Sequence, residues 1–268
     1  LNPTPSDVRA TLMTSAPARF EAIKAHDLNI LVQPYLYIGI VILILLIAIR
    51  LTKMPKASDE GGEEKSLWTA VKQLSKVKNY REGVIAQFFY VGAQTVCWAY
   101  IVYYGHHVFH DLDGMADKAA DQLTTRFYLT ALALFAIGRF VFTGFLKFVK
   151  PGKLLSVISI GAIVLLCGVI FADGKPGLYC LVAVSGCMSL MFPTIYGIAL
   201  NGLKENVKFG SAGLIMSILG GSVIPPIQAA IMDVKGDVLG LSSMNFSFFV
   251  PFICFAVIAI YGFRSLKN

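Results

Sequence analysis

Seven long apolar stretches separated by polar segments dominate this sequence. They lie at about residues 33–50, 82–104, 127–147, 154–172, 177–200, 209–232 and 244–263. Each is close to the ~20 residues that an α-helix needs to cross the ~30 Å hydrocarbon core of a bilayer. Lipid cannot hydrogen-bond irregular backbone, so stretches of this kind form helices in a membrane. We therefore predict an all-α membrane protein with seven transmembrane helices.

The composition supports the membrane class and excludes several others. Hydrophobic residues make up 56% of the chain and charged residues only 15%. The net charge of +7 comes from basic residues in short segments beside the apolar stretches, so we predict no nucleic-acid binding. The five cysteines lie inside apolar stretches without metal-type or disulfide-type spacing. We expect no cofactor and no bound metal.

The basic residues also predict the orientation in the membrane. Of the 23 lysines and arginines, 15 lie in one set of alternating loops, at residue 50 and in 51–81, 147–153, 201–208 and the tail after 263. Seven lie in the opposite loops, and Arg139 lies within a span. The positive-inside rule then places the C-terminus in the cytoplasm and predicts a multi-pass protein of a bacterial inner membrane.

Four segments follow from this pattern. We predict an outer loop at 1–32, a transmembrane helix at 33–50, a cytoplasmic linker at 51–81 and six further spans within 82–268. The linker carries an apolar stripe, Leu67, Trp68, Val71 and Leu74, which suits either a helix at the membrane interface or a solvated helix. The chain begins at Leu1 without a signal-peptide pattern, so we expect a fragment that lacks its start.

One span, within Arg81–Gly105, carries polar side chains at helical spacing. Gln87, Tyr90, Gln94 and Trp98 are three, four and four residues apart and share one face of a helix. Hydrogen-bonding side chains are costly against lipid, so this face is expected to meet other helices or a watery cavity. The alternative is that the glutamines only hydrogen-bond between helices.

The same span resembles the seventh helix of the fucose permeases, a family of sugar:proton symporters in the major facilitator superfamily. The resemblance rests on AQFFYVGAQTVCW at Ala86–Trp98, with further segments resembling the sixth, eighth, tenth and eleventh helices. Those segments are RLTKMPKASD at Arg50–Asp59, IGRFVFTGF at Ile137–Phe145, FPTIYGIALNGL at Phe192–Leu203 and FGSAGLIMSILGGSVIPP at Phe209–Pro226. The resemblance covers nearly the whole chain.

The resemblance implies that the last six spans form the C-terminal half of a major facilitator fold. Such transporters bind substrate between two six-helix halves near the midplane of the membrane. The partners it implies are a monosaccharide, protons as coupling ion, the lipid bilayer and an N-terminal half missing from this chain. The function it implies is transport of a fucose-type sugar by alternating access.

Residue by residue, Gln94 and Tyr90 match the cavity-facing seventh helix, and Gln87, Trp98 and Gln228 are further candidates for the sugar site. Sugar hydroxyls suit amide donors and acceptors beside an aromatic surface. By the same resemblance, glucose/galactose members carry an acidic residue where Gln94 stands, which favours fucose. Phe192 stands where the fucose-type pattern has tyrosine, and this departure leaves the choice of sugar open.

Conformational roles are expected for two other groups. Arg139 is the basic residue inside a span, and it suits a gate or ion pair, or a side chain that snorkels to the interface. Gly220, Gly221, Pro225 and Pro226 interrupt the sixth span, as expected of a moving element or of a kinked packing helix.

Two rival functions remain at this point. Seven spans with an outer N-terminus also suit a membrane receptor or sensor without transport, although residues 244–263 lack the lysine that a retinal protein needs. A membrane enzyme would have to use His106, His107 and His110, which we expect in a solvated outer loop after Gly105. The chain has no nucleophile and base pair, so we predict that it is not an enzyme.

Overall fold

The computed structural model describes residues 17–51, 67–203, 206–234 and 236–266. The chain divides into two compact units, residues 1–63 and 64–268, which are taken separately below. The described residues are helical apart from turns and one isolated bridge, between Val238 and Leu241.

The first unit contains α2 (Pro17–Leu51), which includes the predicted span 33–50. The helix begins at Pro17, so residues 17–32 are helical where the sequence predicted a loop; residues 1–16 lie outside the described part. Proline suits the first turn because its missing N–H is not needed there, and no glycine or proline follows until Pro34. The apolar side chains of 35–47 are exposed, which suits a helix surrounded by lipid.

The second unit contains a short helix followed by six helical segments that are long and apolar enough to cross a membrane, counted over the described residues. The short helix is α3 (Leu67–Lys76). The six segments are α4 (Lys78–His106) with the π-helical turn η1 (His107–Leu112); α5 (Asp117–Phe145); α6 (Pro151–Phe171); α7 (Lys175–Met188) with α8 (Met191–Leu200); α9 (Val207–Met216) with the 3-10 turn η3 (Ser217–Leu219) and α10 (Gly220–Met232); and α11 (Ser243–Ser247) with α12 (Phe249–Ser265).

These six segments coincide with the six spans predicted between residues 82 and 263. Their ends differ, because hydropathy marks only the part of a helix that lies in hydrocarbon. The largest difference is at His106–His110, where a loop was predicted. That prediction is wrong, since α4 continues through His106 and passes directly into η1.

The linker helix α3 packs on the second unit through one of its predicted apolar residues. Leu74 is buried in a small cluster with Tyr80, Ala199, Leu203 and Leu214, whereas Val71 is exposed. The side chains of residues 67 and 68 lie outside the described part. Of the residues that can be judged, Leu74 thus serves packing against protein.

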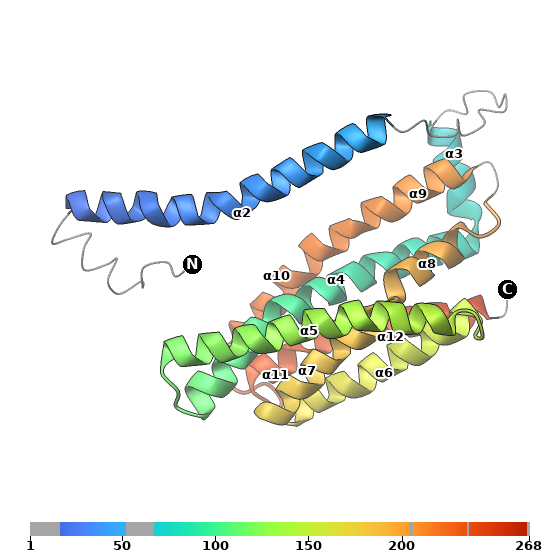
Figure 1. The fold of residues 1–268 in the computed structure, drawn as a ribbon. Helices are drawn as coiled ribbons and strands as arrows, with labels where there is room; N and C mark the ends of the chain where they lie inside the picture. The colour runs from blue at the N-terminus through green and yellow to red at the C-terminus, as the bar shows by residue number, and fades with distance from the viewer. Residues whose placement is uncertain (1–16, 52–66, 204–205, 235, 267–268) are drawn as a thin grey trace. The chain divides into compact units, whose positions relative to one another are not determined.

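Helix α4 is the centre of this unit, and Figure 1 shows it among the surrounding helices. It contacts α5, α7, α8, α10 and α12. Four of its tyrosines donate hydrogen bonds to backbone carbonyls of other segments. These bonds are Tyr80 to Gly210 (3.1 Å), Tyr90 to Met188 (3.0 Å), Tyr100 to Pro225 (3.2 Å) and Tyr104 to Ala172 (3.4 Å). The tyrosines therefore tie α4 to its neighbours along most of its length.

Glycines allow α4 and α10 to approach closely. A Cβ atom on Gly220 would lie 2.0 Å from the carbonyl oxygen of Phe88, and one on Gly92 would lie 2.3 Å from Cγ1 of Ile224. Atoms cannot approach that closely, so both positions require glycine. Gly221 is also restricted, because a methyl carbon added there would lie 2.9 Å from the hydroxyl oxygen of Thr95.

We expect Gly220→Ala to destabilise the protein, because its added methyl group meets backbone that cannot move aside. Overpacking of this kind costs about 1–3 kcal/mol. Gly197→Ala is the matched control, since Gly197 lies in α8 and has nothing within 4 Å of its Cβ position. Thermal unfolding in detergent should show a lower midpoint for Gly220→Ala and an equal or higher one for Gly197→Ala. Equal midpoints for the two variants would contradict the close contact.

Candidate functional site

The polar residues predicted on one face of α4 lie within a continuous helix in the structure. Gln87 and Tyr90 are fully buried, whereas Gln94 and Trp98 are half-buried. The face therefore changes character along its length, from enclosed at Gln87 to partly open at Trp98.

The hydroxyl of Tyr90 is used in helix packing. It donates to the carbonyl of Met188 at 3.0 Å. Met188 is the last residue of α7, where carbonyls lack intrahelical donors. Tyr90 thus caps the end of α7, the interhelical role that the sequence offered as the alternative for this face.

The side-chain amide of Gln87 is buried, and neither its nitrogen nor its oxygen has a hydrogen-bond partner among the described residues. Buried amides are normally paired with protein or water, and an unpaired one costs about 1–3 kcal/mol. A residue with that cost is a candidate for contacts with water or a polar ligand.

Trp98 and Gln94 form the more open part of the face. The indole ring of Trp98 packs edge-on against Phe135 of α5, with ring centroids 5.0 Å apart. Its Nε1 is buried without a partner in the described part of the chain. Gln94 is one turn earlier and half-buried, so its amide is accessible to a polar ligand beside an aromatic wall.

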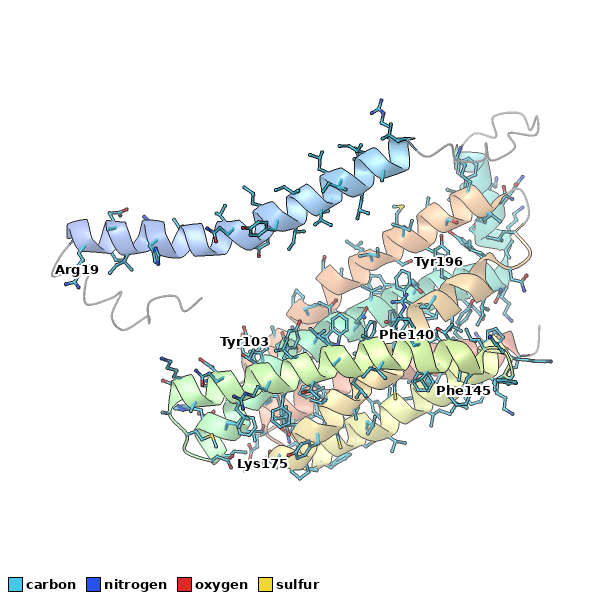
Figure 2. The ribbon with its side chains drawn as sticks, in the orientation of Figure 1. Arg19, Tyr103, Phe140, Phe145, Lys175 and Tyr196 are labelled. Atoms are coloured by element: carbon cyan, nitrogen blue, oxygen red, sulfur yellow. The ribbon has the colours of Figure 1, made fainter. Side chains whose placement is uncertain are left out.

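Aromatic residues of α8 extend this wall. Phe192 meets Tyr90 edge-on at 6.1 Å and stacks on Tyr196 at 6.4 Å, with ring planes 12° apart. The sequence prediction included Phe192 and missed Tyr196, which is labelled in Figure 2. The spacing of four residues in FPTIY could have identified Tyr196, because such residues share a helix face. Tyr196 also supplies a hydroxyl one turn from Phe192.

Gln228 has a different environment from the α4 residues. It is fully buried in α10, and its amide nitrogen donates to the hydroxyl of Ser247 in α11 at 3.1 Å. Its amide oxygen lacks a partner among the described residues. The structure thus uses half of this amide to join α10 to α11.

Arg139 lies on the exposed side of α5, next to Phe140, which is 82% exposed (Figure 2). Its carbonyl accepts a hydrogen bond from Thr143 at 2.5 Å. Its guanidinium interacts electrostatically with Tyr90, which brings a positive charge towards the polar face of α4.

The predicted interruption of the span 209–232 is present as η3 and the following glycines. Pro225 and Pro226 lie inside α10 and provide no N–H groups for the preceding turn. The hydroxyl of Tyr100 donates to the carbonyl of Pro225, so α4 binds this part of α10 directly. Gly220 and Gly221 provide close packing, one of the two roles that the sequence allowed.

The histidines after Gly105 lie on helical turns. The rings of His106 and His110 are 5.1 Å apart, and Nδ1 of His110 lies 3.2 Å from Asp117. Within the described residues, no group of three or more histidine, cysteine or acidic side chains is arranged to hold a metal ion. These residues form ion pairs between the end of α4 and the start of α5.

Comparison with known proteins gives sugar transporters. The chain is 47% identical over 254 residues to an L-fucose-proton symporter of Haemophilus influenzae, covering 95% of this chain and 57% of that protein. It is 33% identical over 271 residues to the L-fucose-proton symporter of Escherichia coli, covering 99% and 58%. A glucose/galactose transporter of Brucella abortus is 29% identical over 238 residues, covering 88% and 53%. No family model matches.

Solved structures give the same fold. A variant of the Escherichia coli fucose:proton symporter aligns with a TM-score of 0.81 and 28% identity over 98% of this chain and 62% of that one. A major facilitator superfamily transporter in the outward conformation aligns with a TM-score of 0.80, also at 28% identity. The resemblance to the fucose permeases is confirmed along nearly the whole chain. The chain spans slightly more than half the length of these curated relatives.

Two buried glutamines allow a test of the polar site. We expect Gln87→Met to stabilise the protein by about 1–3 kcal/mol, because it removes a buried amide without partners. Gln228→Met should destabilise it by about 1 kcal/mol, since it removes the hydrogen bond to Ser247. Thermal unfolding midpoints measure both effects. A fall in the midpoint for Gln87→Met would mean that this amide is paired inside the protein.

Proposed function

We propose that this chain is the C-terminal part of a proton-coupled transporter for a fucose-type monosaccharide, working by alternating access. The observation that supports it best is the polar and aromatic face of α4, with Gln94 accessible beside Trp98. Relatives that align over 95% and 99% of this chain are named L-fucose-proton symporters. Two relatives that are named glucose/galactose transporters are 29% identical, so fucose is the better supported sugar.

The sugar site proposed here consists of Gln94, Tyr90, Gln87 and Trp98 on α4, with Phe192 on α8. Amides provide donors and acceptors for sugar hydroxyls, and aromatic rings cover the apolar side of the sugar ring. Gln228 is a weaker member, because half of its amide is used by Ser247.

A second half of the transporter is part of the proposal. Among the six candidate spans, α5 and the segment α9–α10 are the least buried. Their exposed apolar side chains include Ile137 and Phe140 on α5 and Met216 and Leu219 before α10. In a two-half transporter these faces would be covered by the other half, and the sugar would bind between the halves.

Protons are proposed to be carried by residues outside the spans described here. The acidic residues of the chain lie in the loops or close to the span ends, and a proton relay needs an ionisable group at depth. Arg139, with its charge near Tyr90, and the break at Gly220–Pro226 are proposed to move during the transport cycle. The basic loops favour an inner-membrane protein with a cytoplasmic C-terminus.

Uptake of labelled fucose by the full-length protein in proteoliposomes tests the site. We expect Gln94→Ala to raise the half-saturating fucose concentration about tenfold, which corresponds to about 1.4 kcal/mol of lost binding. Gln122→Ala is the matched control, because Gln122 is an exposed glutamine at the outer end of α5. Unchanged uptake by Gln94→Ala would remove this residue from the site.

Proton coupling is tested in the same vesicles. An inward proton gradient should drive fucose above its external concentration, and a protonophore should reduce accumulation to equilibration. Exchange of labelled for unlabelled fucose should survive the protonophore, because exchange needs binding and not a gradient. Accumulation that ignores the protonophore would exclude proton coupling while leaving sugar transport intact.

A further inference from the structure

A small cavity lies between the beginning of α4 and the end of α12. It is lined by Glu82, Ile85, Val257, Ile260, Tyr261 and Arg264, and its volume is about 130 Å³. Pockets that enclose a whole small molecule usually measure about 300–1,000 Å³. A ligand bound here therefore inserts one part and keeps the rest outside the cavity.

The surroundings of the cavity suit hydrocarbon for the part that stays outside. Ile85 is 46% exposed and Ile260 is 55% exposed, and both lie in candidate membrane spans. Exposed apolar side chains of a membrane span face lipid chains. The cavity is thus bordered by the surface along which acyl chains lie.

The polar end of the cavity carries one positive and one negative charge. Nη1 of Arg264 donates to Oε1 of Glu82 at 2.9 Å. A guanidinium has five N–H donors and a carboxylate has about four acceptor sites, so this bond leaves most of their capacity available. The pair can therefore bind an anionic and a cationic group at the same time.

Tyr261 adds a third polar group to the cavity. Its side chain is only 3% exposed, and its hydroxyl has no hydrogen-bond partner among the described residues. Buried tyrosine hydroxyls usually have a partner, because leaving one unpaired is costly. A ligand oxygen in the cavity would provide that partner.

We propose that this cavity binds the head group of phosphatidylethanolamine, a phospholipid with one phosphate and one primary ammonium. Arg264 and Tyr261 donate to the phosphate, and Glu82 accepts from the ammonium. The acyl chains lie along Ile85 and Ile260. On the orientation proposed above, the lipid belongs to the cytoplasmic leaflet, and its binding does not depend on which sugar is carried.

The charge pair selects against two other common head groups. Phosphatidylglycerol offers no cation, so its phosphate would lie beside the unneutralised carboxylate of Glu82. Phosphatidylcholine offers a cation without N–H donors, which cannot hydrogen-bond to that carboxylate. A charge-assisted hydrogen bond contributes about 1.5–3 kcal/mol, so we expect at least about tenfold preference for the primary amine.

The test uses the full-length protein in nanodiscs that contain equal amounts of the three lipids, with the lipids retained on release measured by native mass spectrometry. We expect retained phosphatidylethanolamine to exceed each of the others about tenfold or more. Ile260→Trp should abolish this preference by filling the cavity. Ile253→Trp should preserve it, because Ile253 is 57% exposed on the same helix and does not line the cavity.

Charge variants provide the second arm of the test. Glu82→Gln should reduce the preference for the primary amine over phosphatidylglycerol, and Arg264→Gln should reduce retention of the lipid phosphate. Lys153→Gln, at an exposed basic position on α6, should change neither. Equal retention of the three lipids by the unaltered protein, or an unchanged preference in Ile260→Trp, would overturn the proposal. Fucose uptake is a separate measurement, so a failure of the transport proposal does not alter this outcome.

Discussion

The close contact between α4 and α10 is the constraint on which the second unit depends. Lipid is as apolar as the side chains, so helices in a membrane gain little from hiding apolar surface and associate through tight packing and hydrogen bonds. The contact of Gly220 with the Phe88 carbonyl and of Gly92 with Ile224 provides such packing. The tyrosines of α4 add hydrogen bonds to carbonyls of four other segments.

This arrangement gives α4 two functions that share the same residues. The helix is the packing centre of the unit, and it also carries the polar face proposed to bind sugar. Tyr90 shows the overlap most clearly, since its ring is in the core and its hydroxyl binds the end of α7. Gln94, which is half-buried, is free of this structural role in the described contacts and is therefore the better probe of binding.

The spans could be predicted from the sequence because membrane thickness sets both the length and the apolar character of each helix. Helix ends could not, since a helix that leaves the hydrocarbon continues without any hydropathy signal, as at Pro17 and His106. The shared face of Gln87, Tyr90 and Gln94 followed from spacing alone. Their partners did not, because Met188 and Ser247 are distant in sequence from the residues that they bind.

The hydrogen bond from Tyr90 to Met188 also limits the chemistry that this phenol offers. A hydroxyl has a single proton to donate, and here the α7 terminus holds it. Towards a sugar, Tyr90 therefore acts as an acceptor unless α7 is released. The carbonyl of Met188 is in effect an internal competitor for the substrate, and a sugar that needs a donor at this position gains only the difference between two hydrogen bonds.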